Sequence, residues 1–347
     1  QHNIEAFGSL EGTDFSNGYQ QLTLLTTYTH EVTDDFSLIY TLSYDWRDHE
    51  QRRPQQEQLF NLDKVVFAYM EEEFYARVLG KWNPGENHSF ALGAEYSYDK
   101  FMQPSPGYPH QGPNFVGSFA PWSAGTFSVL GEYQLRLWDD LAIFLGGRAD
   151  RHDFTTWMYS PKVALIYDVN EQDTAKLIYN GSVRRNDDFE LISQERGGNT
   201  PGDTEEIDQF EFRWERQTEE FFWALSGFYS EHDILAFDFA AIKSRPLGLL
   251  KFYGLEFEGR WEIGDFELSA SHAYTKLLDF DLTDPPSATQ LISAYPYGFG
   301  KDLANWSNHI SKLQVIYEAN DKLSLDTSLR YFWKFPGAQD YTEYNNA

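Results

Sequence analysis

Hydrophobic and polar side chains alternate along most of this chain. In one segment the apolar Phe36, Leu38 and Tyr40 are separated by the polar Ser37 and by Ile39, the single exception. A period of two places the two sets on opposite faces of a β-strand. The pattern recurs over stretches of roughly ten residues, whereas soluble strands average about 5–6 residues and tilted strands that cross lipid need about 9–11. It therefore favours long strands with one apolar and one polar face.

Aromatic residues of the apolar face gather near the ends of these segments, as Tyr44, Trp46, Tyr331, Trp333 and Phe335 do. Amphipathic rings are stable at a lipid–water boundary, and outer-membrane barrels carry a girdle of them at each interface. The alternative is the inner face of a soluble β-sandwich. We consider it the weaker interpretation, because the polar face carries charges on nearly every strand and no helical segment is available to cover the apolar one.

The connections between these segments alternate in length. Short turns rich in Asn, Asp and Gly are expected at 33–35, 83–87, 139–140, 170–173, 217–219, 264–265 and 319–321. Longer polar stretches lie at 48–63, 102–124, 185–206, 237–250 and 281–305, and the connection near 155–160 is short where a long one is due. Short turns on one rim and long loops on the other are typical of periplasmic turns and extracellular loops.

The fold class predicted is therefore all-β, an antiparallel transmembrane β-barrel, of which about fourteen strands are present. The predicted strands are 19–30, 36–47, 65–82, 88–101, 125–138, 141–154, 161–169, 174–184, 207–216, 221–234, 251–263, 266–277, 309–318 and 322–335. With this parity both ends of the chain lie on the extracellular side. We expect residues 1–347 to be a single barrel-domain fragment of a larger up-and-down barrel, which lacks the closing C-terminal hairpin.

Composition limits the function. Asp and Glu number 54 against 27 Lys and Arg, a net charge of -27, which argues against a nucleic-acid partner because such proteins need a basic surface. The absence of cysteine removes disulfides, thiolate metal sites and cysteine nucleophiles. A mean hydropathy of -0.55 is compatible with a barrel, since only alternate strand residues face lipid.

Five segments resemble strands of the TonB-dependent outer-membrane receptors. The stretch 160–167 (SPKVALIY) is similar to the family's Ser-Pro-Arg strand, and 175–191 (AKLIYNGSVRRNDDFEL) to the strand that follows it. The stretch 142–150 (AIFLGGRAD) resembles its GxRxD strand, 253–258 (YGLEFE) its GxExE strand, and 205–211 (EEIDQFE) a further strand, with Thr204 where proline is usual. The pieces occur in the family's order, at hairpin spacing, between residues 125 and 335.

The resemblance implies a transporter rather than an enzyme. It would lie in the outer membrane of a Gram-negative bacterium and import a scarce large solute, most readily a ferric siderophore. Its implied partners are outer-membrane lipid, lipopolysaccharide, an iron chelate and the TonB complex, the last through an N-terminal plug region that we do not find in this sequence. A passive porin-like channel is the alternative, and a soluble β-sandwich binding protein is the second alternative.

Two sets of residues are candidates for binding. Aromatic residues expected in the long loops form either a ligand vestibule or a self-packed cover: Tyr108, Phe115, Phe119, Trp122, Tyr295, Tyr297, Phe299 and Trp306. Charges expected on the lumen face contact either an anionic chelate or plug carboxylates: Arg136, Arg148, Asp150, Arg184, Arg185, Arg213, Glu256, Glu258, Arg260 and Arg330. We predict no catalytic residue, no cofactor and no metal site, since no two histidines have ligand spacing.

Overall fold

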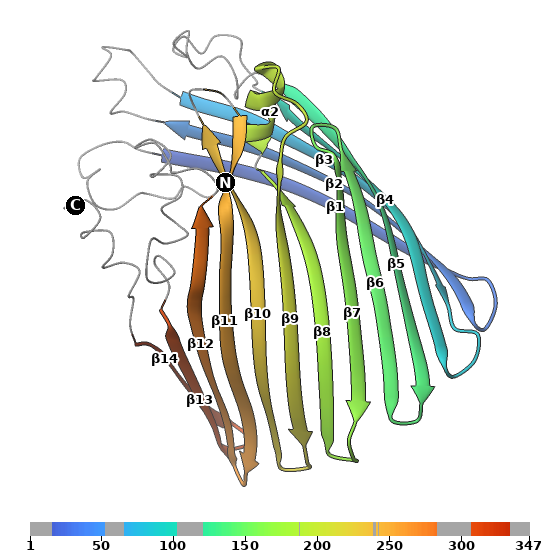
Figure 1. Ribbon diagram of the computed structural model, residues 1–347, viewed down its shortest axis with the longest axis vertical. Helices are drawn as coiled ribbons and strands as arrows, with labels where there is room; N and C mark the ends of the chain where they lie inside the picture. Colours follow the sequence, from blue (N-terminus) through green and yellow to red (C-terminus); the bar gives the residue numbers. More distant parts are fainter. Residues whose placement is uncertain are drawn as a thin grey trace.

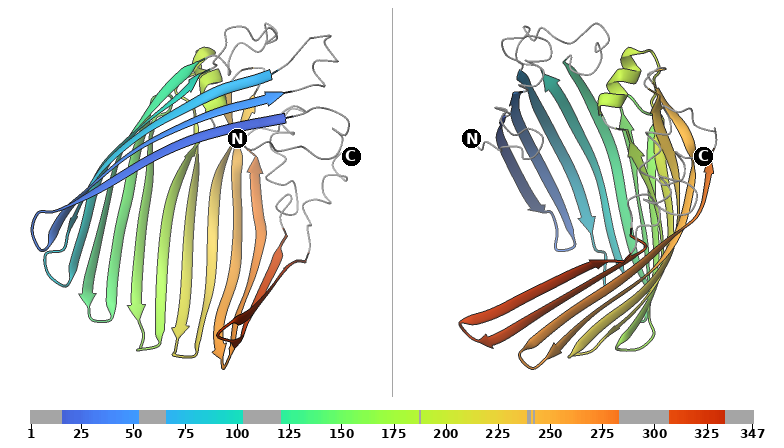
Figure 2. Two further views of the ribbon diagram at one scale, coloured as in Figure 1. Left: turned by 180° about the vertical axis from the view of Figure 1, so that it is seen from behind. Right: turned by 90° about the vertical axis from the view of Figure 1, so that its left-hand side faces the viewer.

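The computed structural model describes residues 16–52, 66–102, 121–186, 188–238, 241, 243–282 and 307–333. These residues form one 14-stranded sheet in which the strands follow one another in chain order. Every neighbouring pair is antiparallel, and the sheet curls into an open trough whose two edge strands are β1 and β14 (Figures 1 and 2).

The elements, in chain order, are β1 (Ser16–Glu31), β2 (Phe36–Arg52), β3 (Val66–Trp82), β4 (His88–Met102), β5 (Trp122–Trp138), β6 (Leu141–His152), β7 (Trp157–Asp168), β8 (Asp173–Arg185), α2 (Asp188–Arg196), β9 (Thr204–Gln217), β10 (Phe221–Asp238), β11 (Lys243–Ile263), β12 (Phe266–Leu282), β13 (His309–Asn320) and β14 (Leu323–Phe332).

The all-β, antiparallel prediction is confirmed, as are the fourteen strands. The strands are long, between 10 residues in β14 and 21 in β11. Among the described residues there is no second sheet on which the first could pack, as the soluble sandwich would require. No described helix has the length and apolar character needed to span a membrane.

The register defines two faces of the sheet. One polar row runs across neighbouring strands through Thr41, Arg77, Glu95, Ser128 and Asp150, each opposite the next. Successive side chains of a strand point to opposite sides, so all residues of this parity share what we call the inner face. The other parity forms the outer face. Ends of strands joined by short turns are the turn end of the sheet, and the opposite ends are the loop end.

The outer face is apolar and uncovered within the described part of the chain. Leu92 on β4 is 68% exposed, Leu329 on β14 61% and Leu24 on β1 57%. A monomeric soluble protein rarely leaves so large a continuous apolar surface in water. At the turn end the same face carries stacked rings, such as Phe266 and Tyr317, whose centroids are 4.5 Å apart. Contact with lipid, bordered by an aromatic belt, accounts for both features.

The short turns predicted from the sequence are present. Between β1 and β2, the amide of Val32 donates to the carbonyl of Phe36 over 2.9 Å. The hydroxyl of Thr33 donates to the carboxylate of Asp35 over 2.6 Å, and this hydrogen bond lowers the pKa of Asp35. The connection between β6 and β7 is short as well, since β6 ends at His152 and β7 begins at Trp157.

The loop end differs from the prediction in two places. The prediction of a long loop at 237–250 is wrong, because β10 continues to Asp238 and β11 begins at Lys243. The register of β10 and β11 shifts between Ile234 and Leu235, which are opposite Gly248 and Pro246. The proline and the glycine interrupt the alternation of apolar and polar residues in the sequence, but the strand continues through them. The expectation of no helix is also wrong, since α2 lies in the stretch 185–206.

The helix α2 is fastened to the loop end of the sheet (Figure 1). Its Leu191 and Ile192 are buried. After the helix, the amide of Gly202 donates to the carbonyl of Phe154 in the β6–β7 connection over 2.7 Å. Thr155 in that connection forms an isolated bridge with Gly202. The short β6–β7 connection thus supports the β8–β9 connection through direct backbone contacts.

Two glycines on strands allow a matched test of how closely the sheet is packed. A Cβ added to Gly254 would lie 2.4 Å from the ring of Phe228 and 2.7 Å from the carbonyl oxygen of Tyr274, whereas one added to Gly147 would meet nothing nearer than 3.9 Å. We expect Gly254→Ala to destabilise the folded protein by about 1–3 kcal/mol and Gly147→Ala by less than about 0.5 kcal/mol. Urea unfolding in detergent measures both, and equal midpoints for the two variants would contradict the packing described.

Candidate functional site: the inner face and its mouth

Glu95 is the centre of an ionic network on the inner face of β3 to β6. Its side chain is only 8% exposed and accepts hydrogen bonds from the hydroxyl of Tyr75 at 2.9 Å and from Nη1 of Arg148 at 2.5 Å. Arg148 also donates through Nε to Asp150 at 2.6 Å. The small Ser128 stands between β4 and β6, and this allows Arg148 to reach across β5 to Glu95.

A second network joins β8, β9 and β11. Arg213 pairs with Glu215 at 2.5 Å and with Glu258 in close contact, and its Nη1 donates to Ser226 at 3.1 Å. Lys176 pairs with the other oxygen of Glu215 at 2.7 Å. The arrangement again skips a strand, because Arg213 on β9 reaches Glu258 on β11 over the short side chains of β10. The predicted residues Arg213 and Glu258 are therefore brought together.

Further predicted charges form local pairs. Arg184 donates through Nε to Glu205 at 2.7 Å. Arg260 contacts Glu262 at 3.2 Å and Glu267 at 3.1 Å. Both arginine side chains are more than half exposed, so solvent screens these pairs and they add little to stability.

Three predicted charges remain open to the interior. Arg136 and Glu256 are exposed at inner-face positions. Arg330 is directly opposite Lys312, and both line an inner-face hollow of about 480 Å³. Like charges placed opposite each other repel. Arg260 and Glu258 also line this hollow, and Glu258 is paired with Arg213, so the net positive lining favours an anionic group.

The prediction for Arg185 requires a correction. It directly follows Arg184 in β8 and is opposite Thr204 in β9. Since Arg184 belongs to the inner face, alternation places Arg185 at an outer-face position, together with Tyr179 and Gly181. The sequence suggested a lumen arginine because a pair of arginines ends the strand, but only one of two neighbours can point inward.

Seven of the eight predicted loop aromatics lie outside the described residues: Tyr108, Phe115, Phe119, Tyr295, Tyr297, Phe299 and Trp306. The eighth, Trp122, is not in a loop but is the first residue of β5. Its ring stacks on Phe101 of β4 at a centroid distance of 5.9 Å. The two rings line a small hollow of about 130 Å³ near the loop end, together with the inner-face charges Asp45, Arg47, Glu71, Glu73 and Asp99.

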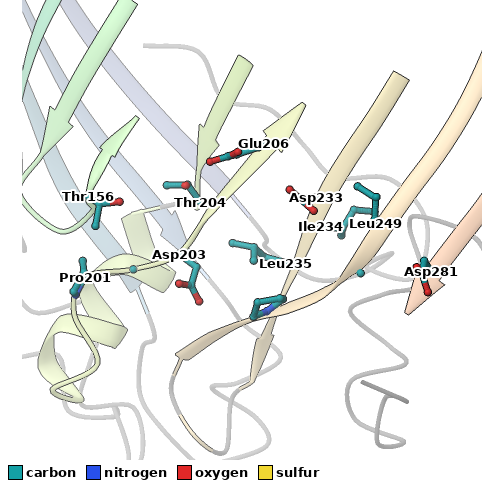
Figure 3. A pocket seen from close by; sticks show the side chains of 13 residues that line it. Thr156, Pro201, Asp203, Thr204, Glu206, Asp233, Ile234, Leu235, Leu249 and Asp281 are labelled. Carbon is teal, nitrogen blue, oxygen red and sulfur yellow. The ribbon is translucent and has the colours of Figure 1, made fainter. Parts of the chain in front are cut away.

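A larger hollow of about 630 Å³ also lies at the loop end (Figure 3). Carboxylates from separate segments are spread along it: Asp203, Glu206, Asp233 and Asp281. Glu206, Asp233 and Asp281 occupy outer-face parity, so this hollow is not part of the inner face. Within the described ranges no group of three or more His, Asp or Glu is placed to hold a metal ion.

The residues missed by sequence reasoning are mainly the partners of predicted charges. Glu95, Lys176 and Glu215 were not singled out, although alternation places each on the polar face. Their pairing follows from register across two strands, which no single segment of sequence reveals. Taken together, the inner face is a polar wall whose charges are held by one another and whose remaining cations are available to an anionic partner.

The Glu95 network makes a specific stability prediction. Glu95→Gln removes the charge that faces both Arg148 and Arg77, whose Nη1 is 3.8 Å from the same carboxylate. We expect it to destabilise the protein by about 1–3 kcal/mol, because two cations then repel each other beside a largely buried amide. Glu262→Gln is the matched control at a 61% exposed position, where the expected change is at most about 1 kcal/mol. Unfolding midpoints that shift equally would show that Glu95 is not the centre of the network.

The comparisons with known proteins agree with this architecture. A family model described as "TonB dependent receptor-like, beta-barrel" matches residues 3–347. A search of curated proteins finds no match.

Solved structures with a similar fold include the FrpB iron transporter of Neisseria meningitidis in its apoprotein form, with a TM-score of 0.71 and 14% identity over 95% of this chain and 54% of that one. The ferric enterobactin receptor PfeA of Pseudomonas aeruginosa, solved as a point mutant, gives a TM-score of 0.67 and 15% identity over 90% of this chain and 49% of that one. The siderophore receptor PirA of Acinetobacter baumannii gives 0.66 and 13% over 92% and 52%.

This chain spans about half the length of these solved structures. At such low identity these structures show the fold alone. The family model covers nearly every residue. The chain therefore belongs to the family of TonB-dependent receptor β-barrels.

Proposed function

We propose that the protein containing this chain imports a scarce large solute across the outer membrane of a Gram-negative bacterium, and that the solute is a ferric siderophore. The observation that carries the proposal is the charged inner face on a sheet of the TonB-dependent receptor family. Structural neighbours described as a ferric enterobactin receptor and a siderophore receptor support the choice of solute.

The inner-face cations give the proposal its chemistry. Ferric siderophores are bulky and commonly anionic, so they need a wide hydrated path with fixed positive groups rather than a narrow apolar one. Arg136 and Arg330 are exposed on the inner face. Arg148 and Arg213 are further cations on this face, and ion pairs with carboxylates fix their positions. These arginines contact either the chelate or carboxylates of a plug domain in the barrel.

The loop end is the proposed entrance. Trp122 and Phe101 are at the inner-face mouth, where their stacked rings offer an apolar surface to an entering solute. The remaining proposed partners are lipopolysaccharide around the barrel and the TonB complex on its periplasmic side. The protein acts as a receptor and transporter in this proposal, with no catalytic step.

Uptake measurements in the native bacterium test the proposal. Deletion of the gene is expected to abolish growth on at least one ferric siderophore as the only iron source, and the natural gene supplied in trans is expected to restore it. Import through this receptor should stop when TonB is deleted, because solute release from this family's barrels requires the inner-membrane energy source.

A passive channel makes the opposite prediction. Growth on the siderophore that continued without TonB, while still requiring this gene, would favour a porin-like pore. Unchanged growth of the deletion strain on every siderophore and other scarce solute supplied would overturn the import proposal.

A further inference from the structure

A hollow of about 1330 Å³ lies on the outer face of β2 to β6, toward the turn end. Its walls are apolar side chains and glycine backbone, contributed by Leu38, Val78, Gly80, Leu92, Val129 and Gly131 among others. None of these strands is an edge strand of the described sheet, since β2 is paired with β1 and each of the others has both of its neighbours in place. The hollow is therefore a property of the sheet and not of an open edge.

The bottom of the hollow lies close to the backbone of the sheet, because two glycines, which have no side chain, flank a leucine there. Gly80 on β3, Leu92 on β4 and Gly131 on β5 are opposite one another in a single outer-face row. A Cβ added at Gly131 would meet no atom nearer than Leu92 Cδ1 at 3.6 Å, so the space above this residue is open. The next row contains Ala94 and Val129, which are also short.

The lower rim of the hollow is a stack of rings at the turn end. Trp82 and Phe90 have centroids 5.3 Å apart, and Phe90 and Tyr133 are 4.4 Å apart. The hydroxyl of Tyr133 shares a hydrogen bond with Nδ1 of His88 at 2.9 Å. Rings with polar tips are stable at the level of lipid headgroups, so this rim marks the periplasmic boundary of the hydrocarbon.

The hollow lies between two outer-face rings of β4 whose spacing corresponds to one leaflet. On β4 the next large ring of the outer face after Phe90 is Tyr96, six residues farther along the strand. Six residues of a strand tilted by about 40° rise by about 15 Å, which is half of a hydrocarbon core of about 30 Å. A molecule in this hollow would therefore have its polar end beside His88 and Tyr133 and its apolar part within the periplasmic leaflet.

We propose that this hollow binds an acyl chain of a phospholipid, with the headgroup held by His88 and Tyr133. The hollow is continuous with the lipid-facing surface, and phospholipid is the lipid of the periplasmic leaflet of an outer membrane. Acyl chains gain no hydrophobic free energy by moving from lipid into the hollow, but an unfilled hollow loses dispersion contacts on both sides. A chain seated between the ring stack and Tyr96 restores these contacts. The site is independent of the transported solute.

The test uses the natural full-length protein extracted from outer membranes in mild detergent and analysed by native mass spectrometry. Gly131→Phe directs a ring into the hollow from a position where an added Cβ meets no atom nearer than 3.6 Å. Leu177→Phe is the matched control, since it adds a ring to a 53% exposed outer-face position on β8, away from the hollow. Migration of unheated samples on gels verifies that both variants are folded.

We expect the natural protein and Leu177→Phe to retain one phospholipid, and Gly131→Phe to retain it at least about tenfold less. His88→Ala combined with Tyr133→Phe should weaken retention without filling the hollow. Equal retention by Gly131→Phe and the natural protein would overturn the proposal. So would a retained molecule that is lipopolysaccharide, or a dimer of this protein that Gly131→Phe dissociates, because each identifies a different occupant.

Discussion

A polypeptide that crosses lipid has no water with which to bond its backbone, so each N–H and C=O must be paired within the protein. In the described chain the strands from β2 to β13 meet this constraint through one ladder, whereas the edge strands β1 and β14 are paired along one side each. Between β2 and β3 the register runs unbroken from Phe36–Trp82 to Arg52–Val66. Register shifts in the described sheet lie toward its turn end or its loop end, as between Arg136 and Trp138 beside a short turn. Irregular backbone is thus placed where water or headgroups can solvate it.

The same ladder determines where charge can go. A strand inside a continuous sheet has only two faces, and a Lys or Arg side chain directed into hydrocarbon costs about 2–4 kcal/mol at the bilayer midplane, with a smaller cost for Asp and Glu. Charges of the strand interiors therefore gather on the inner face, where they are close enough to interact. Glu95 and Arg148 belong to β4 and β6, and Arg213 and Glu258 to β9 and β11. The inner wall is ordered by these pairs while it remains polar enough for a hydrated path.

Sequence alone was sufficient for most of the fold, because alternation and turn chemistry are local properties. It identified fourteen strands and their short turns, including the unusual β6–β7 connection. It failed where local signals mislead. Pro246 and Gly248 suggested a loop inside β11, and the polar segment Asp188–Arg196 has no helical apolar stripe that would have revealed α2.

For the candidate site, alternation predicts the face of a residue but not its partner. The face of Arg148 and Arg213 followed from their position in a strand. Their partners depend on the register of three successive strands, and therefore on every turn and bulge between them. Arg185 shows the limit of reasoning from residue type, since its neighbour Arg184 already occupies the inner position.

Small residues have opposite consequences on the two faces of this sheet. On the inner face, Ser128 and Ala224 stand between charged neighbours two strands apart, and their small size allows long side chains to meet above them. On the outer face, Gly80 and Gly131 flank Leu92, and the aliphatic neighbours leave the space above Gly131 open. On the inner face, long polar side chains close such a gap by forming ion pairs. On the outer face, aliphatic side chains cannot do so, and the gap is filled by a lipid chain. The inner face is solvated by water and the outer face by lipid. A small residue therefore allows an ion pair to form above it on the inner face, whereas on the outer face it leaves a hollow that a lipid chain can occupy.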